Sequence, residues 1–239
     1  DMQSVRGMQT IHPFLADDYH IRWSTLTPDH VEADINKGLE IAEANLEELR
    51  KLDAAELSYA NTFEALETAS EELDRAWGRL NHLDSVCNDE GQRAALNAAL
   101  PRVTSFYAAI PLDDAIWEKL KAFSDLDAFQ DLDATRKRYV EETCTSFIQS
   151  GANLPLDKKS RIAEVQSRLS EITQKFGENV LDSTNAWELV IDDESRLAGL
   201  PESAKAAAAA DAEGKGYEGK WRFTLQYPSM GPVLQYADD

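Results

Sequence analysis

The sequence is poor in cysteine, in positive charge and in long apolar runs. Its 239 residues include only Cys87 and Cys144, which excludes a framework of several disulfides and suits a reducing compartment. Lys and Arg number 24 against 44 Asp and Glu, a formal net charge of −20, whereas phosphate backbones and anionic membrane surfaces select clustered Lys and Arg. No run approaches the roughly 18 apolar residues that a membrane-spanning helix needs. We therefore expect neither a nucleic-acid partner nor a membrane partner.

The first ten residues also lack the basic and then apolar segments of a secretory signal peptide. Hydrophobic residues nevertheless make up 43% of the chain. A chain of this length with that composition buries about 70% of the surface of its unfolded state, so extensive disorder is not expected. These properties predict an acidic, globular protein with a cytoplasmic location.

Apolar residues recur at three- and four-residue steps over most of the chain, which is typical of amphipathic helices. The expected helices cover residues of about 28–51, 61–84, 89–110, 116–123, 134–150, 157–182 and 202–212. Thr27 and Pro28 form a start signal for the first helix, and Asn61 and Glu64 have the spacing of a capping box for the second. Pro101 predicts a kink or a break in the third.

The helix at 157–182 carries apolar residues on one face and charged residues on the other. The apolar residues are Ile162, Val165, Leu169, Ile172, Phe176 and Val180. Glu164 with Arg168, and Glu171 with Lys175, have the spacing of favourable pairs on the solvent side of the helix.

Two short segments after residue 185 alternate like strands, at 187–191 and 221–225, and could pair as an antiparallel ribbon. Ser229 is a candidate N-cap for a last helix that runs to Tyr236, close to the end of the chain. Because the sequence ends so close to this expected helix, we interpret the chain as the N-terminal part of a longer protein.

The sequence thus predicts a mainly α fold, a multi-helical lobe of long amphipathic antiparallel helices with a small two-stranded β ribbon near the C-terminus. We expect an extended N-terminal arm at residues 1–26, a helical domain at 27–185 and a strand–helix–strand segment at 186–239.

Metal-binding patterns are incomplete in this sequence. The four histidines are His12, His20, His30 and His82. None has the His-Glu-x-x-His spacing, and the neighbours His30 and Asp34 lack a third and a fourth ligand. The acidic run at 125–133 has Gln130 and Arg136 where a calcium loop of the EF-hand type needs Gly and Glu. We therefore predict no metal ligand and no cofactor-binding residue.

Other catalytic patterns fail for reasons of context. Residues 214–219 spell G-x-G-x-x-G, but a helix precedes them and a strand follows, the reverse of a dinucleotide-binding loop. Neither Cys87 nor Cys144 has a histidine near it in sequence that could activate the thiol. The sequence therefore nominates no catalytic residue, and whether this chain alone is an enzyme stays open.

Nine short segments, taken in order, are similar to those of a known family. They are HPFL (12–15), LTPDHV (26–31), NTFE (61–64), LNHL (80–83), LP (154–155), RLSE (168–171), FGENVLD (176–182), LPESA (200–204) and YPS (227–229). In this order they resemble the N-terminal region of the thimet oligopeptidase/oligopeptidase A family of zinc metallopeptidases, which includes the bacterial dipeptidyl carboxypeptidases.

The resemblance implies one lobe of a helical shell around a channel for short peptides. In that family a His-Glu-x-x-His helix and a downstream Glu bind zinc, and these residues lie beyond the part that this chain matches. The resemblance therefore implies zinc for the parent enzyme and none for this chain. Its implied partners are short peptides, in the full-length enzyme, and the missing C-terminal catalytic region; the chain alone would be inactive.

Two other functions remain open. A free-standing acidic helical module that binds a peptide or a protein would have a compact, closed core, whereas a lobe would leave an apolar face exposed. A helical enzyme with a site of no known motif would show a buried polar cluster. The negative charge maintains solubility in any of these cases, and it could also attract the basic termini of peptides.

Overall fold

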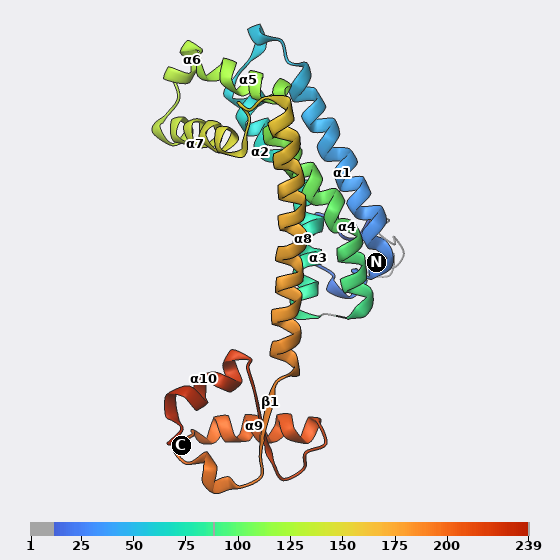
Figure 1. The fold of residues 1–239 in the computed structure, drawn as a ribbon, viewed down its shortest axis with the longest axis vertical. Coiled ribbons are helices and arrows are strands. Elements are labelled where there is room, and N and C mark those ends of the chain that lie inside the picture. The colour runs from blue at the N-terminus through green and yellow to red at the C-terminus, as the bar shows by residue number, and fades with distance from the viewer. Residues whose placement is uncertain (1–11, 88, 239) are drawn as a thin grey trace, which may run out of the picture. The chain divides into compact units, whose positions relative to one another are not determined.

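The structure, a computed structural model, describes residues 12–87 and 89–238 and confirms the mainly α fold (Figure 1). The chain divides into two compact units, residues 1–171 and 172–239. The division falls inside helix α8 (Leu156–Ala186). We describe each unit by itself.

The first unit consists of helices and short helical turns. In order they are η1 (Trp23–Thr25), α1 (Pro28–Lys51), η2 (Ala54–Glu56), the π-helix η3 (Ala60–Glu64), α2 (Ala65–Thr68), α3 (Glu71–Val86), α4 (Glu90–Ala109), η4 (Ile110–Leu112), α5 (Asp114–Ser124), α6 (Asp127–Gln130), α7 (Ala134–Ser150) and the first part of α8. The predicted bounds of α1 and α7 are confirmed, and α7 ends at Gly151 with a φ of 110°, a conformation that favours glycine.

Helix α1 joins two hydrophobic clusters because its apolar stripe continues through all 24 residues. Its N-terminal half contributes Val31 and Ile35 to a cluster with α3 and α4. Its C-terminal half contributes Leu46 and Leu49 to a second cluster with η3, α5 and α7. Figure 1 shows α1, α3 and α4 side by side. At Gly38 a Cβ atom would lie 3.1 Å from the Cα of Leu73, so α1 and α3 approach closely there.

The predicted second helix, residues 61–84, is wrong as a single element. It begins one residue earlier, as η3, and it is interrupted at residues 69–70 between α2 and α3. The side-chain amide of Asn45 on α1 donates to the carbonyl of Ala69 at 3.0 Å, a tertiary contact that sequence periodicity does not contain. Asn61 does not cap the helix: its side chain binds the backbone of Ser58 and Glu56 in the preceding loop, so the capping box is absent.

Of the kink or break that was predicted at Pro101, the break is absent. Helix α4 is continuous from Glu90 to Ala109 and is capped by Asp89, whose carboxylate accepts from the amide of Gln92 at 2.8 Å. Two residues on the flanks of Pro101, Ala99 and Val103, are buried in the cluster with α1 and α3. Tertiary burial on both sides of the proline offsets the loss of one helical hydrogen bond.

The second unit contains the rest of α8, β1 (Glu188–Ile191), η5 (Glu194–Leu197), α9 (Glu202–Gly214), β2 (Trp221–Thr224) and α10 (Tyr227–Tyr236). The predicted ribbon is confirmed: β1 and β2 pair antiparallel, with Leu189 opposite Phe223. Helix α9 packs on β2, and together they bury a small core around Phe223, Leu197 and Ala212. A two-stranded ribbon needs such a helix, since it is marginally stable alone.

The start of the last helix differs from its prediction. Helix α10 begins at Tyr227, and Ser229 lies in its first turn rather than at its cap. The Ser229 hydroxyl accepts from the amide of Thr224 at 2.9 Å and so ties α10 to the end of β2.

Residues 1–11 of the predicted N-terminal arm lie outside the described part of the chain. Residues 12–26 form turns and η1, and they bury Phe14 and Leu26 against α1 and α3. No helix in the described ranges combines the length and apolar character needed to cross a membrane.

Candidate functional site

Helix α8, drawn in yellow to orange in Figure 1, carries an exposed apolar face. The residues of this face, which we call the α8 seam, are Val165 (50% exposed), Leu169 (59%), Ile172 (51%), Phe176 (68%) and Val180 (49%). The sequence predicted the alignment of these five residues and placed Ile162 with them; Ile162 is half-buried and is not part of the exposed face. The boundary between the units divides the seam after residue 171, and within each unit no described element covers its members, although a stripe of this width normally faces a core.

The polar side of α8 is the more protected one in the first unit. Gln166 and Ser170, which lie away from the seam, are half-buried. The start of the helix is held by Lys159, a buried residue whose Nζ donates to the carbonyl of Leu112 at 3.0 Å and pairs with Asp114. Helix α8 is thus attached to the first unit through polar groups and through the half-buried Ile162, whose side chain lies beside Gly151, whereas the seam residues are exposed.

The charged pairs of α8 differ from the predicted ones. The observed pairs join Arg161 to Glu164 and Arg168 to Glu171 at 2.7 Å, and Lys175 to Glu178 at 3.2 Å, all with a spacing of three residues. The predicted pairs had the opposite order and a spacing of four. Each basic residue lies next to the seam, and all three are about 70% exposed.

His30 and Asp34, the pair that the sequence suggested as two metal ligands, bind different partners. The His30 ring contacts the Thr27 hydroxyl at 2.9 Å. Asp34 is fully buried; its carboxylate contacts the His12 ring at 2.8 Å and accepts from the amide of Phe14 at 2.7 Å. The role of Asp34 in holding the arm was missed, because an isolated Asp on a helix gives no sign of burial.

The other histidines and the acidic run have structural positions. His82 packs on Trp23, with ring centroids 5.1 Å apart, and His20 packs edge-on against Tyr19. Asp133 caps α7 by accepting from the amide of Arg136 at 2.9 Å, and this hydrogen bond lowers the pKa of its carboxyl. Among residues 12–87 and 89–238 no group of three or more His, Cys, Asp or Glu is placed to hold a metal ion.

The glycines of the G-x-G-x-x-G segment lie at the end of a helix and in a turn, and the two cysteines are free thiols. Gly214 ends α9, and Gly216 and Gly219 have φ values of 81° and 71° in the turn that leads to β2. Cys87 is exposed after α3. Cys144 is half-buried against the cluster with α5 and α7, and burial raises the pKa of its thiol, the opposite of an activated nucleophile.

An open cleft of about 850 Å³ lies between η3, α2 and α7. Tyr59 and Tyr139 line it; the Tyr139 hydroxyl donates to Glu67, and the guanidinium of Arg136 lies 5.3 Å from the centre of the Tyr59 ring. The cleft therefore already contains a cation of the chain itself over an aromatic ring. Nothing in it forms a nucleophile–base pair.

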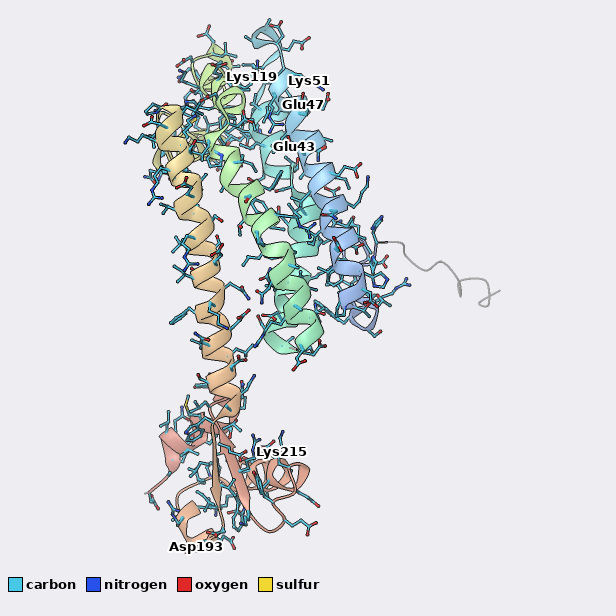
Figure 2. All side chains as sticks on the ribbon, turned by 45° about the vertical axis from the view of Figure 1, so that its right-hand side comes forward. Glu43, Glu47, Lys51, Lys119, Asp193 and Lys215 are labelled. Atoms are coloured by element: carbon cyan, nitrogen blue, oxygen red, sulfur yellow. The ribbon has the colours of Figure 1, made fainter. Side chains whose placement is uncertain are left out.

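A charged cluster joins α1 to the start of α5. Arg50 donates to Asp113, the N-cap of α5, at 2.7 Å and to Glu43 at 2.6 Å, and these hydrogen bonds raise its pKa against the opposing effect of burial. Figure 2 shows Glu43 and Glu47 one turn apart on α1. The cluster fixes two helices and has no group free to react.

In the second unit the buried Arg222 of β2 binds two carboxylates. Its Nε donates to Glu188 at 2.7 Å, and its Nη1 donates to Asp211 of α9 at 2.5 Å. The Arg222 guanidinium and the Tyr217 hydroxyl, 2.7 Å from the other Glu188 oxygen, lower the pKa of Glu188. This cluster joins β1, β2 and α9, and sequence reasoning missed it because its members are far apart along the chain.

The lowered pKa of Glu188 predicts an acid-sensitive second unit. An unperturbed glutamate has a pKa of 4.5, so below that pH the unfolded chain binds the proton before the folded one does. The stabilisation by Glu188 is therefore complete above pH 4.5 and is lost as the pH falls through the lowered native pKa. We expect Glu188→Gln to flatten the acid limb of melting temperature against pH, followed by circular dichroism. Glu213→Gln, at an exposed position of α9, serves as the control, and an unchanged acid limb in Glu188→Gln would contradict the prediction.

Comparison with known proteins gives one consistent result. Residues 35–159 match the family model described as "Neurolysin/Thimet oligopeptidase, N-terminal domain". Oligopeptidase A of Haemophilus influenzae is 33% identical to the chain over 217 residues, which are 91% of this chain and 31% of that protein. Oligopeptidase A of Escherichia coli is also 33% identical, over 91% of this chain and 32% of its own length.

A more distant similarity covers nearly the same region. The dipeptidyl carboxypeptidase of Escherichia coli is 24% identical in an alignment of 246 positions, gaps included, that covers 97% of this chain and 34% of that protein. The chain therefore spans about a third of the length of the curated relatives that it matches.

Proposed function

Because the chain belongs to the neurolysin/thimet oligopeptidase family, we propose that it is the N-terminal helical region of an oligopeptidase A-like zinc metalloendopeptidase that hydrolyses short peptides. In this proposal the helices form one wall of a channel that admits short unfolded peptides. The partners are such peptides, within the full-length enzyme, and the C-terminal catalytic region. We also propose a cytoplasmic location.

The exposed α8 seam is the observation that supports a lobe rather than a free-standing binding module. A module would close its core, whereas a lobe keeps an apolar face for the polypeptide that completes the protein. Phe176, the most exposed member of the seam at 68%, is a large aromatic residue in the middle of this face. The relatives are about three times as long as this chain and thus contain material that could cover it.

The described residues do not fit a zinc ion. A catalytic zinc takes three protein ligands from His, Glu, Asp or Cys, and no group of three such residues is assembled in the described ranges. We therefore assign no catalytic step to this chain. In the proposal, zinc belongs to the part of the relatives that lies beyond the match.

The experiment is a peptidase assay on the chain alone. We expect that zinc and an internally quenched peptide give no cleavage above the rate without protein, since no zinc ligand set is assembled in the described part of the chain. Oligopeptidase A of Escherichia coli, assayed in parallel, is the positive control for the substrate. Cleavage by the chain that a chelator abolishes would overturn the assignment of an inactive region.

A further inference from the structure

We propose that the open cleft between η3, α2 and α7 is a binding site for the basic side chain of a peptide, an arginine or a lysine. All residues that line this cleft belong to the first unit. The inference deepens the proposed function and rests on it, since short peptides are the ligands that this function supplies. The family match gives neither the place nor the class of side chain.

The lining of the cleft combines aromatic rings with short side chains. Tyr59 and Tyr139 are half-buried and line the cleft together with Ala60 and Ala65. The volume of about 850 Å³ is in the range of ligand-binding sites. Aromatic and short apolar side chains suit the aliphatic stem of an arginine or a lysine, which buries its methylene groups while its charged end stays at polar groups.

The acidic groups in the cleft outnumber the basic ones. Glu64 and Glu67 contribute carboxylates, and Arg136 contributes a guanidinium. This guanidinium lies 3.4 Å from a carboxylate oxygen of Asp133 and 3.9 Å from one of Glu64, so two negative charges flank it. Glu67 has no cation as a partner within the described part of the chain; its hydrogen bond comes from the neutral Tyr139 hydroxyl. One carboxylate of the cleft is therefore not compensated.

The Tyr139 hydroxyl leaves the charge of Glu67 in place. Burial and the hydrogen bond to Glu67 raise the pKa of Tyr139, so the phenol keeps its proton at neutral pH and acts as the donor. A carboxylate accepts several hydrogen bonds. Among the residues that the structure describes, none donates to the second oxygen of Glu67, which can thus bind a guanidinium or an ammonium group.

Arg136 is an example, within the chain, of a cation in this cleft. Its guanidinium lies 5.3 Å from the centre of the Tyr59 ring, and its side chain is 52% exposed. Such exposed contacts are weak, so a basic ligand can compete for the ring or bind beside Arg136 at Glu67. An anionic ligand fits less well, because two carboxylates already flank Arg136. The net charge of −20 also favours the approach of a cation.

The experiment is an NMR titration of the whole chain with two small probes, N-acetyl-arginine amide and N-acetyl-citrulline amide. The two probes have nearly the same shape, but citrulline has a neutral urea group in place of the guanidinium. We expect the arginine probe to bind about fivefold more tightly at low salt, and the difference to shrink at high salt. The backbone amides of residues 59–68 and 134–139 are expected to shift most.

Three variants at exposed positions test the charge of the cleft. Glu67→Gln keeps an acceptor for the Tyr139 hydroxyl but removes the charge, and is expected to weaken binding of the arginine probe by about threefold. Glu141→Gln makes the same change on α7 outside the cleft, and is expected to alter binding by less than about 1.5-fold. Arg136→Gln removes the competing cation and is expected to tighten binding by about threefold. Circular dichroism is expected to show folded proteins.

Four results would overturn the proposal. Equal binding of the two probes would show that the charge is not recognised, and largest shifts outside the cleft would place the binding elsewhere. Equal effects of Glu67→Gln and Glu141→Gln would show that only the net charge attracts the probe. Unchanged or weaker binding in Arg136→Gln would show that Arg136 does not compete with a cation.

The binding readout does not involve catalysis. Chelator-sensitive cleavage by the chain would refute the assignment of an inactive region and leave the probe preference unchanged. An absent probe preference would refute the binding site without affecting the peptidase assay.

Discussion

Phe63→Ala is expected to lower the free energy of unfolding of the first unit by about 3–5 kcal/mol. Phe63 lies on the π-helix η3 and is fully buried. Its ring centre lies 5.7 Å from that of Phe123 on α5 and 6.3 Å from that of Tyr139 on α7. Removing the ring leaves a cavity, because the three elements around it cannot all move inward. We therefore expect a loss of unfolding free energy in the upper part of the range for core substitutions.

Urea unfolding followed by far-UV circular dichroism measures this effect, and the chain supplies a matched control. Phe176→Ala makes the same chemical change on α8, where the ring is 68% exposed, so the expected loss in the isolated chain is less than about 0.5 kcal/mol. Equal losses at the two positions would contradict both the buried position of Phe63 and the exposed position of the α8 seam.

Asp34→Ala is expected to cost about 2–4 kcal/mol and to release the N-terminal arm. The fully buried carboxylate binds the His12 ring and the amide of Phe14, while Arg79 of α3 donates to the carbonyl of Phe14 at 2.9 Å. Alanine leaves the buried amide of Phe14 without an acceptor. It also removes one of the two side chains, Asp34 and Arg79, that bind the backbone of Phe14 and that we call the clamp. Phe14, only 1% exposed, then loses its fixed place between α1 and α3.

Asp34→Asn is the control for this prediction, because its side-chain oxygen can still accept from the Phe14 amide. We expect it to cost less than half as much as Asp34→Ala in urea unfolding. Limited proteolysis supplies a second readout: cleavage near residues 12–16 is expected to accelerate strongly in Asp34→Ala and weakly in Asp34→Asn. If alanine leaves both the unfolding curve and the cleavage rate unchanged, the clamp does not hold the arm.

These two positions show where sequence reasoning stopped. Phe63 lies in the segment 61–84, which its periodicity predicts as helical, since helical periodicity depends only on spacing. The π-helix that carries it and the break before α3 were not recognised, because they depend on contacts such as that of Asn45 with Ala69. Asp34 was weighed as a metal ligand beside His30, whereas its real partners, His12 and Phe14, come from the arm.

By itself the sequence determined the mainly α fold, the bounds of α1 and α7, the antiparallel ribbon and the family, because each of these depends on local periodicity, on capping residues or on the order of short segments. Only the tertiary structure decided which apolar faces are covered. The stripes of α1 and α8 look alike in the sequence, yet Ile35 of α1 is buried and Phe176 of α8 lies in solvent. The physical reason is that an apolar stripe indicates that one face of a helix is more stable when it is buried. The stripe does not indicate which part of the polypeptide packs against that face.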